Sequence, residues 1–132
     1  ADSQTVSWGA IRRFHVIDRG WSDIGYHFGI ELAGPVYEIL FGRMPDEDGA
    51  HAVGYNGRSL GVCFVGNFDQ DEPPAAQWRS GIKLARWMVR QFGIPVDNII
   101  GHREVAGVTK SCPGTKFDME KFRTDVRSGE FV

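Results

Sequence analysis

Apolar residues recur every three or four positions in three parts of the chain, the spacing that places them on one face of a helix. This pattern predicts helices over residues 6–17, 75–92 and 117–126. The middle helix is the clearest, because two prolines precede it and Gly93 supplies a stop after it. Its apolar stripe is more typical of a face packed on a core than of a binding face, and consists of Trp78, Ile82, Ala85, Val89 and Phe92.

Alternating and continuous apolar runs predict the strands. Residues 26–32 alternate, and a Gly-Pro turn joins them to a second, paired strand over residues 36–41. Residues 60–65 are apolar throughout, as expected for a central strand covered on both faces. A short strand is also expected over residues 96–100, whereas residues 42–57 form a loop long enough to suggest a function. The class is therefore α/β or α+β, with a central mixed sheet flanked by helices.

Length and charge narrow the range of partners. The chain has 132 residues and a formal net charge of -2, which fits one domain over its whole length. A near-neutral charge argues against nucleic acid, because phosphate contacts need a basic surface, and against docking on anionic lipid. No apolar run approaches the roughly 20 residues of a membrane span. The first residues are polar and show no signal peptide, so we expect synthesis in the cytoplasm.

The four histidines fall into two groups. His15 lies in the first predicted helix, where a structural or surface role is expected, and His27 lies on a strand, on the opposite face from its neighbours. His51 and His102 lie in loops or at strand ends, where polar side chains project into clefts. Of the two cysteines, Cys63 is expected to be a small core residue inside its apolar strand.

His102 and Cys112 form the pair of greatest chemical interest. Imidazole and thiolate are both good zinc ligands, so a strand-end histidine and a loop cysteine ten residues later could converge on one ion. The spacing is none of the familiar zinc-binding patterns, and a capping histidine beside an ordinary thiol is the alternative. Lys110 adds a cation next to the cysteine, where it could stabilise an oxyanion.

Five segments of the chain come in the order and spacing of the type-2 N-acetylmuramoyl-L-alanine amidases, a family that includes phage lysozyme-like amidases and animal peptidoglycan recognition proteins. The resemblance extends over residues 11–122. It is nearer to the phage and bacterial branch, because Lys110 stands where the animal branch usually has threonine. The segments are DIGYHF (23–28), GAHAVGYN (49–56), SLGVCFVG (59–66), GHREV (101–105) and KSCPG (110–114).

This resemblance implies a central mixed sheet with helices packed on it and a groove on one face. It implies hydrolysis of the amide between N-acetylmuramic acid and the first L-alanine of peptidoglycan, by a zinc ion that two histidines and one cysteine hold. His102 and Cys112 match two of these ligands. Tyr26 matches the catalytic tyrosine near the metal, and Lys110 matches the residue that stabilises the tetrahedral intermediate.

The resemblance also assigns the substrate groove. His51, Tyr55 and Asn56 match residues that hold the glycopeptide, and Arg43 is expected to join them. His27 matches a mainly structural histidine.

In one respect the chain departs from the family pattern. The family's first zinc-binding histidine lies on a strand before the first helix, and the chain starts at Ala1, only a few residues before that helix. We therefore expect the strand and its histidine to be absent from these 132 residues. Two functions remain open: a zinc amidase that acts as a phage endolysin or bacterial wall enzyme, and a peptidoglycan-binding module without catalysis. We expect a monomer, unless the open sheet edge drives self-association.

Overall fold

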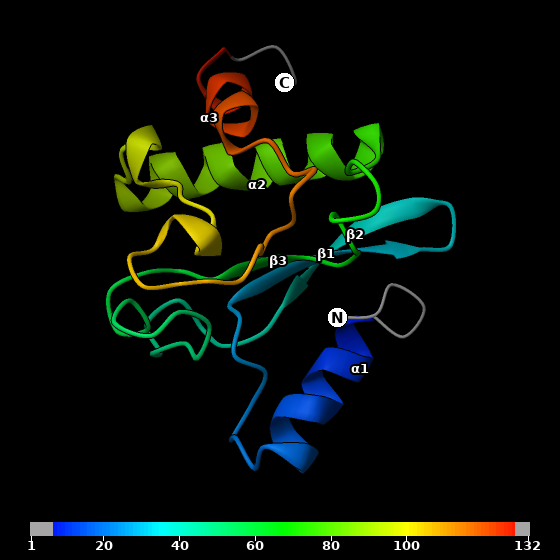
Figure 1. The fold of residues 1–132 in the computed structure, drawn as a ribbon, viewed down its shortest axis with the longest axis vertical. Coiled ribbons are helices and arrows are strands. Elements are labelled where there is room, and N and C mark those ends of the chain that lie inside the picture. The colour runs from blue at the N-terminus through cyan, green and yellow to red at the C-terminus, as the bar shows by residue number, and fades with distance from the viewer. Residues whose placement is uncertain (1–6, 129–132) are drawn as a thin grey trace. The chain divides into compact units, whose positions relative to one another are not determined.

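The computed structural model describes residues 7–128, and they form an α+β fold with a mixed three-strand sheet and three α-helices, as the sequence predicts (Figure 1). The chain divides into two compact units, residues 1–67 and residues 68–132. The first unit carries α1 and the sheet, and the second carries α2 and α3. Among residues 7–128, no helix has the length and apolar character that crossing a membrane requires.

The first unit begins with α1 (Trp8–Arg13), which continues as a π-helical segment over Phe14–Asp18. Ser7 caps α1, because its hydroxyl oxygen accepts a hydrogen bond of 3.0 Å from the main-chain N–H of Ala10. The predicted helix over residues 6–17 is thus confirmed where the structure describes it, and Val6 lies outside the described residues.

The sheet contains β1 (Phe28–Ala33), β2 (Val36–Phe41) and β3 (Val62–Phe64), in the order β2-β1-β3. The antiparallel β1–β2 hairpin has the predicted second strand, although β1 starts two residues later than expected. β3 runs parallel to β1.

The prediction that residues 60–65 form a central, fully covered strand is wrong. β3 has only three residues, all half-buried, and within the described sheet it pairs with β1 alone. β1 is central instead, and its residues Phe28 and Ile30 are at most 1% exposed. The apolar character of β3 therefore does not reflect a central position in the described sheet. Cys63, which was expected to be a small core residue, is only half-buried.

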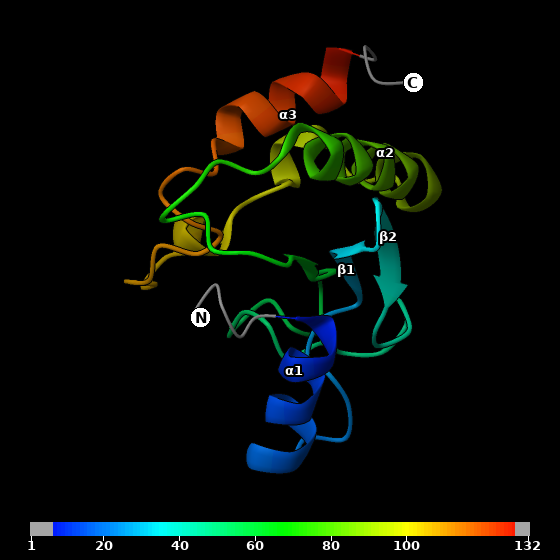
Figure 2. The same cartoon turned by 90° about the vertical axis from the view of Figure 1, so that its right-hand side faces the viewer.

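α1 makes a close contact with β1 through Trp8. The indole of Trp8 covers Gly29, where an added Cβ would lie 2.2 Å from the ring atom Cζ3. The main-chain N–H of Trp8 also donates a 3.1 Å hydrogen bond to the carboxylate of Glu31 on the same strand. In Figures 1 and 2 α1 lies below the sheet, with its N-terminal end nearest the strands.

The second unit is built on α2 (Ala75–Phe92) and α3 (Met119–Ser128), which lie side by side (Figure 2). α2 has its predicted bounds and ends at Gly93, whose φ of 65° is left-handed. The predicted stripe is only partly buried, because Trp78 lies in the core while Phe92 is 43% exposed. The core around Trp78 is aromatic and includes Phe68, Phe117 and Phe122.

The strand predicted over residues 96–100 is also wrong. Val96–Asn98 form a 3₁₀ turn, in which the N–H of Asn98 donates to the carbonyl of Pro95 and the N–H of Ile99 to that of Val96. Turn formation at Pro-Val-Asp-Asn outweighs the strand preference of the neighbouring isoleucines.

Two glycine-to-alanine substitutions in the first unit test the α1–β1 contact. We expect Gly29→Ala to lower the free energy of unfolding by about 1–3 kcal/mol, because the new methyl group overpacks against Trp8. Gly9→Ala is the matched control in α1, where an added Cβ meets nothing within 4 Å. It should raise stability by about 0.5–1 kcal/mol through helix propensity. Urea unfolding measures both, and equal effects would contradict the contact.

Candidate functional site

The long loop of the first unit is closed by the side chain of Asn56. Its Oδ1 accepts hydrogen bonds from the main-chain N–H of His51, at 2.7 Å, and of Ala52, at 2.8 Å. The main-chain carbonyl of Asn56 accepts a third, from Gly49 at 2.9 Å. These bonds set the position of His51, whose ring stacks on that of Tyr26 with 6.4 Å between the ring centroids. The structure therefore brings together three residues that the resemblance assigned to the site.

His27 is buried, and both of its ring nitrogens bond to the main chain. Nδ1 accepts a 3.0 Å hydrogen bond from the N–H of Gly61, so Nε2 carries the proton and donates it to the carbonyl of Glu47 at 2.7 Å. The imidazole thus ties the start of β1 to the long loop and to the segment before β3. His27 has the structural role that the family resemblance implies.

Arg43 also acts on the main chain. Its guanidinium donates hydrogen bonds to the carbonyls of Ile24 at 2.9 Å, Asp48 at 2.7 Å and Asp23 at 3.5 Å. Through these bonds the Arg43 side chain holds the start of the long loop against residues 23–24. Arg43 therefore supports the loop through main-chain hydrogen bonds.

Tyr55 lies in the same loop and is half-buried. The guanidinium of Arg58 lies over its ring, 4.3 Å from the centroid. The main-chain carbonyl of Tyr55 accepts a 2.7 Å hydrogen bond from the hydroxyl of Ser59. The cation on one face of the ring restricts the phenol within the loop that Asn56 closes.

His15 supports Tyr26 from the helical side of the unit. Its Nδ1 accepts a 2.9 Å hydrogen bond from the main-chain N–H of Gly25, and its ring centroid lies 6.1 Å from that of Tyr26. Burial lowers the pKa of His15, and the positive charges of Arg19 and Arg43 lower it further. The neutral form, which leaves Nδ1 able to accept, is therefore favoured.

The second unit carries the other three predicted site residues. His102 opens a 3₁₀ turn over His102–Glu104, and the main-chain N–H of the next residue, Arg103, donates a 2.7 Å hydrogen bond to the carbonyl of Cys112. The chain segments that carry the two predicted ligands are thus neighbours. Lys110 is exposed in the same loop as Cys112.

The thiol of Cys112 lies in a mixed environment. Much of the residue is exposed, yet desolvation around the thiol raises its pKa, while the positive charges of Lys110 and Arg103 act in the opposite direction. Desolvation is the largest of these influences, so the pKa of the thiol is raised overall despite the two cations.

The donor chemistry of this pair suits zinc, which prefers imidazole nitrogen and thiolate sulfur. Within residues 7–128, however, no group of three or more His, Cys, Asp or Glu side chains is arranged to hold a metal. The described residues therefore supply two donors of the right type, His102 and Cys112, and not a complete three-ligand set.

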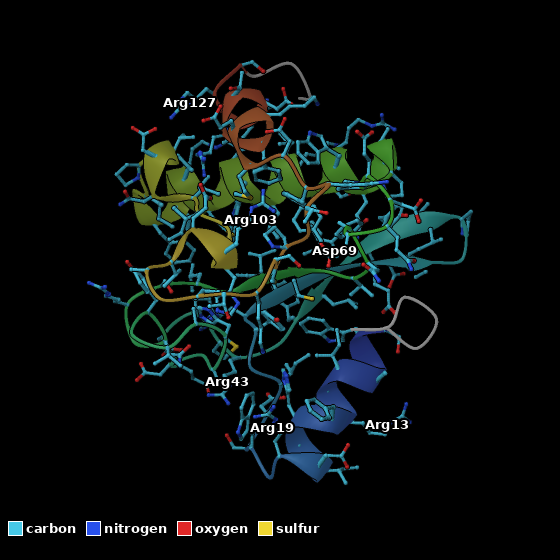
Figure 3. The ribbon with its side chains drawn as sticks, in the orientation of Figure 1. Arg13, Arg19, Arg43, Asp69, Arg103 and Arg127 are labelled. Atoms are coloured by element: carbon cyan, nitrogen blue, oxygen red, sulfur yellow. The ribbon has the colours of Figure 1, made fainter. Side chains whose placement is uncertain are left out.

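Sequence reasoning missed two residues of the second unit, Arg103 and Asp69, whose side chains bond to the loop on either side of Cys112 (Figure 3). Arg103 lies inside the GHREV segment, which is recognisable in the sequence but indicates no role for its middle residue. Asp69 lies in no recognised segment, and nothing in its local sequence signals the contact.

Comparison with known proteins gives a consistent result. A sequence model of the N-acetylmuramoyl-L-alanine amidase family (Amidase_2) matches residues 1–115. The endolysin of Enterobacteria phage K11 is 37% identical over 126 residues, which are 92% of this chain and 76% of that protein. Peptidoglycan-recognition protein LB of Drosophila melanogaster is 36% identical over 108 residues, 81% of this chain and 44% of that protein. The chain thus spans less than half the length of the latter.

Solved structures show the same relationship. The N-acetylmuramoyl-L-alanine amidase LysC from Clostridium intestinale URNW superposes with a TM-score of 0.73 and 32% identity, covering 88% of this chain and 72% of that one. A second match is a chain from the structure of tracheal cytotoxin bound to the ectodomain complex of peptidoglycan recognition proteins LCa and LCx. It gives a TM-score of 0.68 and 30% identity, covering 81% of this chain and 62% of that one.

The pKa of His15, which burial lowers, predicts a dependence of stability on pH. The folded pKa of His15 lies below the unfolded value of about 6.5. Its contribution to stability is therefore complete above that pH and is lost as the pH falls through the folded pKa. In His15→Asn the Oδ1 atom can still accept from Gly25 but does not titrate, so its stability should fall less towards acid. Urea unfolding between about pH 5 and pH 8 measures this, and equal slopes for both proteins would contradict it.

Proposed function

Because this chain belongs to the N-acetylmuramoyl-L-alanine amidase family, we propose that it hydrolyses the amide bond between N-acetylmuramic acid and L-alanine in peptidoglycan. The observation that carries this proposal is the family match over residues 1–115, which includes His102, Lys110 and Cys112. Relatives that are named endolysins and N-acetylmuramoyl-L-alanine amidases support the same activity.

We further propose zinc as the cofactor, since members of this family generally depend on it. The imidazole of His102 and the thiolate of Cys112 would hold the ion as two of its ligands. A bound zinc ion supplies a Lewis acid and a water that ionises near neutral pH. The neighbouring main-chain positions of Arg103 and Cys112 support this assignment.

Protein side chains would orient the substrate and stabilise the negative charge that develops during hydrolysis. The ammonium of Lys110 would lie against the carbonyl oxygen of the scissile amide, where negative charge develops in the transition state. For Tyr26 we carry over the family's catalytic role, in which the phenol acts as a hydrogen-bond donor. Within the first unit, the rings of His15 and His51 lie next to that of Tyr26 and restrict its orientation.

In the first unit, His51 and Tyr55 would contact the glycopeptide. Arg43 and Asn56 would support them, since each uses its side chain to bond the main chain of the loop that carries both. This division refines the groove assignment: two residues touch the substrate and two hold the loop. A pre-formed loop loses less entropy when the substrate binds.

The second candidate function is binding of peptidoglycan without hydrolysis. It is favoured by the 36–38% identity to insect peptidoglycan-recognition proteins. Incubation of the zinc-loaded chain with a purified muramoyl peptide separates the two functions. Hydrolysis releases a stem peptide with a new amino group on L-alanine, which mass spectrometry detects. Saturable binding with the ligand recovered intact would support the second function and contradict the first.

The zinc assignment predicts the effect of removing each ligand. His102→Ala and Cys112→Ser should each lower the zinc content of the purified chain, because each removes one donor. Cys63→Ser is the matched control, since Cys63 lies on β3 in the other unit. Elemental analysis after dialysis gives the stoichiometry. Equal zinc in Cys112→Ser and Cys63→Ser would show that Cys112 is not a ligand.

The role of Lys110 predicts a specific kinetic change. Lys110→Ala should lower kcat about 100-fold, the scale of losing one oxyanion donor, with little change in KM. Lys83→Ala removes an exposed lysine from α2 and should leave both constants unchanged. Steady-state kinetics on a muramoyl peptide measure the difference. A normal kcat with a raised KM would instead place Lys110 in substrate binding.

A further inference from the structure

The loop that carries Cys112 has no helix or strand to satisfy its main chain. Residues 110–117 form a series of bends and turns between the 3₁₀ turn at His102–Glu104 and α3. Turns inside the segment satisfy part of its main chain, since the N–H of Gly114 donates to the carbonyl of Ser111 and the N–H of Phe117 to the carbonyl of Gly114. Hydrogen-bond partners from elsewhere add to these bonds, because an unsatisfied polar group away from water costs stability. The second unit supplies them from two side chains.

Arg103 is the first of these side chains. Its Nη1 donates to the carbonyls of Ser111, at 3.4 Å, and of Gly114, and its Nη2 donates to the carbonyl of Phe117 at 2.6 Å. Its main-chain N–H donates to the carbonyl of Cys112. One residue therefore holds the loop before, at and after the cysteine, with donors that the guanidinium fork keeps in fixed directions.

Asp69 holds the same loop with acceptors. Its Oδ2 accepts a 2.8 Å hydrogen bond from the hydroxyl of Ser111, and its Oδ1 accepts one of 2.8 Å from the main-chain N–H of Thr115. The preceding residue, Phe68, adds a main-chain acceptor for Lys116 at 2.7 Å. In Figure 3 the segment leading into α3 runs between the labelled Arg103 and Asp69.

Close packing adds to these bonds at Gly114. A Cβ at this position would lie 2.5 Å from the carbonyl carbon of Phe68, and the φ of 132° is itself one that other residues rarely adopt. The loop thus lies against residue 68 at a distance that only glycine allows. Together the contacts leave the main chain around Cys112 few alternative conformations.

We propose that Arg103 and Asp69 are positioning residues, which fix the main chain on both sides of Cys112 and thereby set its thiol relative to His102. The connection to His102 is direct, because His102 precedes Arg103 in the chain. The identity of the bound ion rests on the proposed function, whereas the hold on the loop does not.

Positioning of this kind has a measurable consequence for metal binding. Groups that orient a ligand from outside the coordination shell change metal affinity by about 10–100-fold when they are removed. Arg103→Lys keeps the positive charge but replaces the fork with one ammonium, which cannot serve the carbonyls of Ser111, Gly114 and Phe117 together.

Arg86→Lys is the matched control for Arg103→Lys. Arg86 also lies in the second unit and donates from its guanidinium to main-chain carbonyls, those of Val126 at 3.1 Å and Asp125 at 2.6 Å, at the end of α3. Asp69→Asn is the milder second variant, because it keeps the side-chain shape and loses one of the two acceptor oxygens. Circular dichroism first establishes that each variant is folded.

Two readouts need no metal. Hydrogen exchange followed by mass spectrometry reports on the amides of residues 110–117, and the alkylation rate of Cys112 reports on its thiol, with Cys63 as the internal reference. We expect exchange in this loop to rise about tenfold in Arg103→Lys and less in Asp69→Asn, with the loop unchanged in Arg86→Lys. Equal loop exchange and equal Cys112 alkylation in Arg103→Lys and Arg86→Lys would overturn the proposal.

The third readout is zinc affinity, measured by competition with a chromophoric chelator. Arg103→Lys should raise the Kd for zinc about tenfold, with Arg86→Lys unchanged. If amide exchange in the loop rises but the Kd for zinc is unchanged, the claim that Arg103 positions Cys112 for the metal is overturned. If the unaltered chain binds no zinc, the proposed cofactor fails. The two metal-free readouts then decide whether Arg103 and Asp69 hold the loop.

Discussion

The loop that carries Cys112 depends on the interaction between the Arg103 guanidinium and the main-chain carbonyls of that loop. Irregular segments can carry reactive side chains only if their own polar main chain is satisfied. Arg103 does this for a loop that neither α2 nor α3 supports by main-chain pairing, and Asp69 completes it from the other side. The predicted ligands His102 and Cys112 lie on the two segments that this interaction joins.

The first unit solves the same problem with different side chains. His27 bonds to the main chain of Glu47 and Gly61, and Arg43 and Asn56 bond to the main chain of the long loop. In both units, therefore, some polar residues of the motifs, such as His27, Asn56 and Arg103, bond to the main chain, and only some of their neighbours are left to meet a substrate. The motifs of this chain therefore contain residues that maintain the local fold as well as candidate reactive groups.

The elements that sequence predicts well are those with clear local signals. The bounds of β2 and α2 follow from a Gly-Pro turn, a Pro-Pro start and a glycine stop. Strand predictions failed where a local signal was overridden: turn residues Asp97 and Asn98 determine the conformation at 96–98, and β3 is apolar without being central. For the site, motif spacing identified the residue types. The contact of Asp69 with Ser111 spans 42 positions and has no periodic or motif signal, so only the folded chain reveals it.

The central claim is that the fold sets Cys112 and His102 to serve one metal ion. X-ray absorption at the zinc edge of the metal-loaded chain tests it most directly, because the fine structure separates sulfur from nitrogen or oxygen ligands. We expect one sulfur ligand together with the scattering pattern of imidazole, and loss of the sulfur component in Cys112→Ser alone of the two cysteine variants. A zinc shell of nitrogen and oxygen only, in the unaltered chain, would contradict the claim.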